Sequence, residues 1–87
     1  MKYHVYIVEC FNGIYYTGYT NNLLARIKLH NSGNGAKSLR GKLPVQLVYT
    51  KRYQYFKSAL NEERRIKRLP RAKKDQLVRE YIRVSKT

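Results

Sequence analysis

The sequence has few acidic side chains. Its 87 residues include five Asp and Glu against 19 Lys and Arg, so the formal net charge is +14 at pH 7. Such a chain is poorly equipped to build the carboxylate clusters that two-metal sites use to hold ions about 4 Å apart. The charge favours a polyanionic partner, because a basic surface raises the local concentration of anions. Nucleic acid is the natural candidate, and its binding would weaken steeply as salt rises.

Cysteine and long apolar runs are also scarce. Cys10 is the single cysteine, so no internal disulfide can form, which favours a reducing compartment. No apolar run approaches the roughly 18 residues that a membrane-spanning helix needs, and residues 1–4 do not resemble the start of a signal peptide. We therefore expect a soluble cytoplasmic protein without membrane association. The length predicts one domain, 1–87.

Hydrophobic periodicity and turn residues predict six elements. In chain order they are strand, strand, helix, strand, helix and helix, over 3–10, 14–20, 23–32, 45–53, 57–68 and 70–83. Asn21 or Asn22 can cap the first helix, with Gly33 past its end. The buried stripe of this helix is predicted to be Leu23, Leu24 and Ile27. The third strand is predicted to turn Val45, Leu47 and Tyr49 to one face.

The loop of the first hairpin decides which side chains share a face. A two-residue loop at 12–13 would pair Tyr6 with Tyr19 and would place Tyr6 and Tyr16 on opposite faces. A three-residue loop, or a bulge, would place Tyr6, Tyr16 and Gly18 on one face. We expect the second arrangement, because a shared site needs both tyrosines together.

Glu63 is the acid whose position most needs an explanation. It falls roughly 30° from the centre of the apolar face of its helix, while Glu62 lies roughly 70° away. Glu63 should therefore point towards the core or a cleft, where an unpaired carboxylate is costly. One explanation is an ion pair with a Lys or Arg. The other is a ligand for a hard divalent cation such as Mg²⁺, which uses few carboxylates together with waters and substrate phosphate.

Four further residues are candidates for chemistry. Arg26 and His30 are four residues apart, so they are neighbours on one helix face. Arg26 can hold a phosphate oxygen, and His30 titrates near neutrality; the alternative is a solvated helix edge. Tyr6 and Tyr16 are two of nine tyrosines, for which packing is the ordinary role. They are singled out by Gly18, which lets another group approach the strand closely.

These motifs, taken in order, resemble the GIY-YIG nuclease superfamily, and its small single-domain branch of bacterial-type proteins in particular. The residues that carry the resemblance are Tyr6-Ile7-Val8, Tyr16-Thr17-Gly18, Arg26, His30 and Glu63. The match runs from about residue 3 to residue 78. Gly13-Ile14-Tyr15 spells the family name but lies in the wrong place. The first family motif falls on His4-Val5-Tyr6, which keeps only the tyrosine.

The resemblance implies an α+β fold in which helices flank a three-stranded mixed sheet, and a one-metal hydrolysis of phosphodiesters. Glu63 would bind Mg²⁺ or Mn²⁺, and Arg26 would hold the scissile phosphate. A tyrosine, Tyr6 by preference, would take a proton from the attacking water. His30 and the nearby positive charges would help, because cations favour the phenolate. Tyr16 would position the water or the phosphate.

The leading hypothesis is a metal-dependent DNA endonuclease that acts in DNA repair or processing. The second is a nucleic-acid-binding module without turnover, for which DNA and RNA are both candidate ligands. Its cations would contact phosphates without base specificity; they are Lys37, Arg40, Lys42, Arg64 and Lys67. A third hypothesis is a small adaptor bound to a larger repair complex. The sequence leaves the oligomeric state open.

Overall fold

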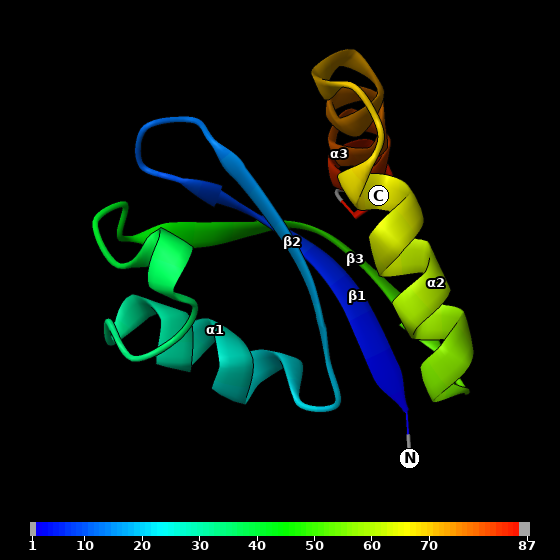
Figure 1. Cartoon of the computed structure of the whole chain (residues 1–87). Helices are drawn as coiled ribbons and strands as arrows, with labels where there is room; N and C mark the ends of the chain where they lie inside the picture. The colour runs from blue at the N-terminus through cyan, green and yellow to red at the C-terminus, as the bar shows by residue number, and fades with distance from the viewer. Residues whose placement is uncertain (1, 86–87) are drawn as a thin grey trace.

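The computed structural model describes residues 2–85 and shows an α+β fold (Figure 1). Its elements are β1 (Tyr3–Cys10), β2 (Tyr15–Thr20), α1 (Leu23–Asn31), the 3₁₀ turn η1 (Lys37–Leu39), β3 (Val45–Tyr53), α2 (Phe56–Lys67) and α3 (Arg71–Ser85). The predicted order of strands and helices is confirmed. The predicted bounds differ from the observed ones by one or two residues at most.

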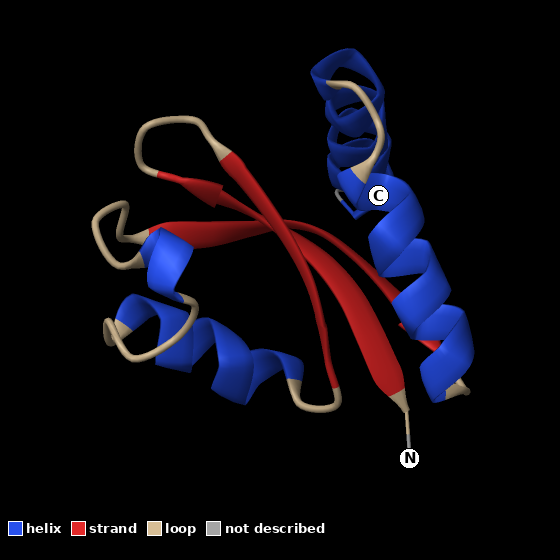
Figure 2. Ribbon diagram, viewed as in Figure 1, coloured by secondary structure: helices blue, strands red, loops and turns tan. Residues whose placement is uncertain are grey.

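The three strands form one sheet in the order β2-β1-β3 (Figure 2). β1 is antiparallel to both of its neighbours, so the expectation of a mixed sheet is wrong. After β2 the chain passes through α1 and rejoins the sheet as β3, on the other side of β1. β2 and β3 therefore run in the same direction, but β1 lies between them and no parallel pair forms.

The β1–β2 hairpin has the three-residue loop that a shared tyrosine face requires. Cys10 N–H donates to the Ile14 carbonyl at 2.8 Å, and Gly13 N–H donates to the Cys10 carbonyl at 2.9 Å. Gly13 has a φ of 87°, a conformation that glycine adopts without steric cost. The resulting register places Tyr6 opposite Gly18. The prediction that Tyr6, Tyr16 and Gly18 share a face is confirmed.

Helix α1 packs on one face of the sheet. The side chain of Asn22 caps it by accepting a backbone N–H three residues on, which satisfies a donor that the helix itself leaves free. Leu24 is 77% exposed, so its predicted place in the buried stripe is wrong. The inward face is instead made by Leu23, Ile27 and His30, which lie at helical spacing. His30 occupies a buried position there because the sheet offers it a hydrogen-bond partner.

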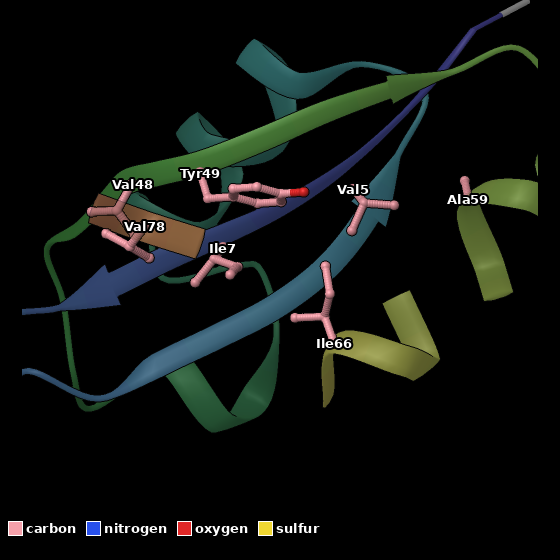
Figure 3. Close-up of a cluster of buried hydrophobic side chains, with 7 residues drawn as sticks. All are labelled: Val5, Ile7, Val48, Tyr49, Ala59, Ile66 and Val78. Carbon is pink, nitrogen blue, oxygen red and sulfur yellow. The ribbon is translucent and has the colours of Figure 1, made fainter. Parts of the chain in front are cut away.

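The opposite face of the sheet packs against α2 and α3 and holds the larger hydrophobic cluster (Figure 3). The buried members of this cluster are Val5, Ile7, Val48, Tyr49, Ala59, Ile66 and Val78. Each large side chain removed from water contributes about 1.5–3 kcal/mol. A second cluster on the α1 side contains Tyr6, Val8, Cys10, Leu39 and Val45. The two clusters hold α1 and α2 on opposite sides of one sheet.

A bulge interrupts the alternation of side chains along β3, so the prediction that Tyr49 shares a face with Val45 and Leu47 is wrong. The register against β1 shifts between Ile7 and Val8, which pair with Tyr49 and Leu47. Val48 is therefore the extra residue, and an extra residue reverses which face the following side chains point to. Tyr49 joins the α2–α3 side, while Leu47 stays on the α1 side.

Arg71 ties the start of α3 to the hairpin. Its guanidinium lies 3.7 Å from the centre of the Tyr15 ring and donates to the Gly13 carbonyl at 2.9 Å. Its Nε also donates to Asp75 Oδ1 at 3.0 Å, and that same oxygen accepts from the Tyr15 hydroxyl at 2.8 Å. Stacking and forked donation together suit arginine better than lysine.

Candidate active site

One cleft collects four of the side chains that the sequence singled out. Tyr6 comes from β1, Tyr16 from β2, Arg26 from α1 and Glu63 from α2, and together they line a hollow of about 400 Å³. Gly18 also lines it. The helices that carry Arg26 and Glu63 lie on opposite sides of the sheet (Figure 1). The cleft therefore depends on the whole fold and not on any one segment.

Tyr6 and His30 form a buried hydrogen-bonded pair beside this cleft. Tyr6 Oη lies 2.8 Å from His30 Nε2, and each residue is 1% exposed. The Ala36 N–H donates to His30 Nδ1 at 3.4 Å, so Nδ1 is an acceptor and the ring proton lies on Nε2. His30 therefore donates to the Tyr6 oxygen. A solvated helix edge, the alternative for His30, is wrong.

Two glycines make room for this pair. A Cβ at Gly18 would lie 2.6 Å from Tyr6 Oη, and a Cβ at Gly35 would lie 2.8 Å from His30 Cα and closer still to His30 Nδ1. Both distances are shorter than ordinary contacts between carbon and another heavy atom. Gly18 was expected from the sequence as a point of close approach, whereas Gly35 was not. The signal for Gly35 was its place in a glycine-containing loop that begins directly after α1.

Burial controls the protonation of the pair. It raises the pKa of Tyr6 above its ordinary value, with the neighbouring Tyr16 as the next cause, while Arg26 acts in the opposite direction. Burial, and then Arg26, lower the pKa of His30. At neutral pH the phenol and the imidazole are therefore both uncharged. The expectation that surrounding positive charge favours the Tyr6 phenolate is wrong for the protein alone, because desolvation of the phenolate outweighs it.

Glu63 points inward as predicted. It is 8% exposed, although it lies on a helix with several exposed cations. Its Oε1 lies 3.6 Å from Lys67 Nζ, so the predicted ion pair exists. The carboxylate also lines the cleft, which places it within reach of a ligand there. The position of Glu63 therefore allows both explanations, an ion pair with Lys67 and a ligand for a cation in the cleft.

A divalent cation suits this donor set. Within residues 2–85 no three His, Cys, Asp or Glu side chains come close enough to hold a metal together. A site with one carboxylate suits Mg²⁺, which keeps several waters and takes further oxygens from a substrate phosphate. The cleft is large enough for a hydrated ion beside Glu63, and Arg26 at its margin could neutralise a phosphate.

The five predicted phosphate-contacting cations lie elsewhere. All five are within the part of the chain that the structure describes, and none lines the cleft. Lys37, Arg40 and Lys42 lie on the segment between α1 and β3, and Arg64 and Lys67 lie on α2. They are at least partly exposed, so they remain candidates for contacts with a longer polyanion that extends beyond the cleft.

Comparisons with known proteins identify the family of this chain. Residues 2–76 match the family model of the GIY-YIG catalytic domain. The UPF0213 protein VNG_2274C of Halobacterium salinarum is 47% identical over 75 residues, which are 86% of this chain and 97% of that protein. The UPF0213 protein OB0043 of Oceanobacillus iheyensis is 44% identical over 77 residues, 88% of this chain and 90% of that protein. The solution structure of the UPF0213 protein BH0048 from Bacillus halodurans has a TM-score of 0.59 at 47% identity, and the match covers 90% of this chain and 83% of that one.

The chain therefore belongs to the GIY-YIG family of nuclease domains. Membership implies a nucleic acid substrate, and nucleases of this family generally use a divalent metal. Among the helices within residues 2–85, none has the length and apolar character to cross a membrane.

Proposed function

We propose that this protein is a metal-dependent DNA endonuclease, which hydrolyses phosphodiester bonds with one divalent ion and acts in DNA repair or processing. The observation that carries the proposal is the cleft itself. A carboxylate, a guanidinium and two phenols from four elements line one hollow in a chain of net charge +14. Tyr6 and Tyr16 also pack in the cluster on the α1 side, but that packing does not account for the guanidinium and the inward carboxylate that line the same hollow.

Glu63 would hold the ion, Mg²⁺ or Mn²⁺, with waters and substrate oxygens completing its ligands. When bound, the ion would stabilise negative charge on the phosphate and on the departing 3′ oxygen. The Glu63–Lys67 contact of 3.6 Å is longer than a hydrogen bond. Lys67 is also largely exposed, so its ammonium can turn into solvent when a cation arrives.

Arg26 would bind the scissile phosphate. Arg26 lines the cleft from α1, and Glu63 lines it from α2. A planar fork of donors matches two phosphate oxygens at once and stays charged throughout the reaction. Arg26 therefore fixes the phosphate and offsets the charge that grows on its oxygens during attack.

Tyr6 would first lose its own phenolic proton to solvent through the cleft, and as the phenolate it would then accept the proton of the attacking water at Oη. Tyr16 would orient the water or the phosphate. Because His30 donates to Tyr6 Oη through Nε2, the Tyr6 proton is free to point into the cleft. The same donor stabilises the phenolate once it forms. Tyr6 is uncharged in the protein alone, since burial raises its pKa, so positive charge brought with the ion and substrate must offset that burial.

The test compares Glu63→Gln with Lys67→Gln as a matched control from the same ion pair. Duplex, nicked, branched and single-stranded DNA are incubated with Mg²⁺, Mn²⁺ or EDTA. Cleavage should need a divalent ion, should be lost in Glu63→Gln and should persist in Lys67→Gln. DNA binding should persist in Glu63→Gln and weaken in Lys67→Gln by no more than the loss of one phosphate contact. Cleavage by Glu63→Gln at the wild-type rate would refute the assignment of Glu63 as metal ligand.

A nucleic-acid-binding module without turnover is the second candidate. Two observations favour it: burial raises the pKa of Tyr6, and Glu63 already has a cation partner in Lys67. On this alternative, DNA or RNA is retained in a salt-sensitive way and neither is cut by any combination of substrate and metal. No retention of either nucleic acid at moderate salt would instead favour the adaptor of a larger repair complex.

A further inference from the structure

Three aromatic rings form a cluster at the margin of the cleft. The Phe56 ring lies 5.7 Å from the Tyr3 ring and 5.6 Å from the Tyr19 ring, with interplanar angles of 63° and 66°. Tyr3 and Tyr19 line the same cleft as Arg26 and Glu63. The cluster is therefore continuous with the place where a phosphate would bind.

This cluster leaves apolar surface in water. Phe56 is the first residue of α2 and is 44% exposed, although it touches two other rings. Contiguous exposed apolar surface marks a binding site, whereas apolar residues scattered singly over a surface need no such explanation. Exposed ring surface is what an unstacked nucleobase binds, because every base has a π-face.

We propose that Tyr3, Tyr19 and Phe56 form a stacking platform for an unpaired nucleobase next to the scissile phosphate, so that the preferred substrate is a DNA strand with unpaired nucleotides at the cut. The inference rests on the proposed function, because it takes Arg26 as the phosphate site. In intact duplex DNA each base is stacked on its neighbours and paired. It would have to be extruded first, which costs the free energy of unstacking and unpairing.

The size and charge of the site agree with a strand in this form. The cleft of about 400 Å³ is in the range of small-ligand sites and suits one nucleotide rather than the width of a duplex. Proteins that bind single strands combine a basic surface with aromatic side chains that stack on bases. This chain has both, with a net charge of +14 and the cluster at the cleft margin.

The experiment measures binding in EDTA, so that it does not depend on cleavage. Fluorescence anisotropy gives the Kd for an oligonucleotide that is single-stranded, fully duplex or flapped. Each form carries 2-aminopurine at the same sequence position, which is unpaired in the single-stranded and flapped forms and paired in the duplex. The single-stranded and flapped forms should bind the wild type more tightly than the duplex does, and 2-aminopurine emission should fall as the base stacks. Phe56→Leu should weaken single-strand binding about 10-fold, with less than a 2-fold change for duplex.

Phe11→Leu is the matched control. Phe11 is an exposed aromatic residue in the hairpin loop, at the opposite end of β1 from Tyr3, and its replacement should change no Kd. If Phe56→Leu unfolds, Tyr19→Phe and Tyr19→Leu replace it, since the first keeps a ring and the second does not. Only Tyr19→Leu should lose affinity and 2-aminopurine quenching.

The outcomes separate the two proposals. Equal Kd values for single-stranded and duplex DNA, or unchanged binding in both Phe56→Leu and Tyr19→Leu, would overturn the platform even if the protein cuts DNA. If the protein binds single strands selectively and quenches 2-aminopurine, but cuts no substrate with any metal, the stacking platform stands and the endonuclease proposal is refuted.

Discussion

Gly18→Ala is the substitution that most directly probes how the site is packed. The added methyl carbon would lie 2.6 Å from Tyr6 Oη and 2.8 Å from Tyr6 Cζ. Non-bonded heavy atoms pack best at about 3.5–4.0 Å, so the ring would have to retreat by roughly 1 Å. Tyr6 is 1% exposed and its hydroxyl is held by His30, so the ring can retreat only by straining that hydrogen bond or by filling part of the cleft that it lines.

The expected cost follows from that crowding. Inserting an extra carbon into a tightly packed contact destabilises a protein by about 1–3 kcal/mol. For a domain of this size each kcal/mol lowers Tm by about 4–8 °C, so the Tm of Gly18→Ala should fall by roughly 5–20 °C in a thermal melt followed by circular dichroism. If the protein cuts DNA, the same displacement should slow cleavage about 100-fold, because misplacement of a reacting group by 1 Å has that effect.

Gly41→Ala is the control for replacing a glycine as such. A Cβ at Gly41 meets nothing within 4 Å, and its φ is not positive, so stability should change by less than about 0.5 kcal/mol. Introducing Gly18→Ala into Tyr6→Phe, which lacks the nearest hydroxyl oxygen, should cost less than in the wild type. A Tm for Gly18→Ala within about 2 °C of the wild-type Tm would refute the packing argument.

Three further predictions concern charge. Because burial lowers the pKa of His30 in the folded protein, the unfolded chain binds more protons below about pH 6.5. The free energy of unfolding from urea titrations should therefore fall between about pH 7 and 5.5, and fall less in His30→Gln; equal slopes would contradict this. A variant with alanine at Lys37, Arg40 and Lys42 should show a weaker salt dependence of duplex DNA binding. The slope of log K against log salt should become less steep by about 0.9 for every phosphate that the variant no longer neutralises. An unchanged slope would exclude a role for these cations in binding. Arg71→Lys should lower stability by about 1 kcal/mol in urea denaturation, because lysine cannot both stack on the ring beneath it and donate as a fork; a variant as stable as the wild type would show that the stack contributes nothing.

Several features of the site could be predicted from local sequence. Once the need for a shared site selects a three-residue turn at 11–13 over a two-residue one, Tyr6 and Tyr16 must share a face, because side chains alternate along a strand and register transmits that alternation to the partner. The periodicity of α2 determines that Glu63 points inward. Both inferences need only geometry that repeats every two or about 3.6 residues.

The remaining features depend on contacts between segments far apart in the chain. The face of α1 that is buried could not be predicted, because Leu24 and His30 compete for it and a hydroxyl on β1 decides in favour of His30. The bulge in β3 arises from its pairing with β1.

The sequence by itself determined the order of the elements and the inward direction of Glu63, since each follows from neighbours a few residues away. It left two hairpin registers open, and the structure decided for the one in which the two tyrosines share a face. Only the tertiary structure decided that Arg26 and Glu63, from opposite sides of the sheet, line one cleft. It also decided that Tyr6 is uncharged there, with its pKa raised, because burial and the approach of distant charges exist only once the chain has packed.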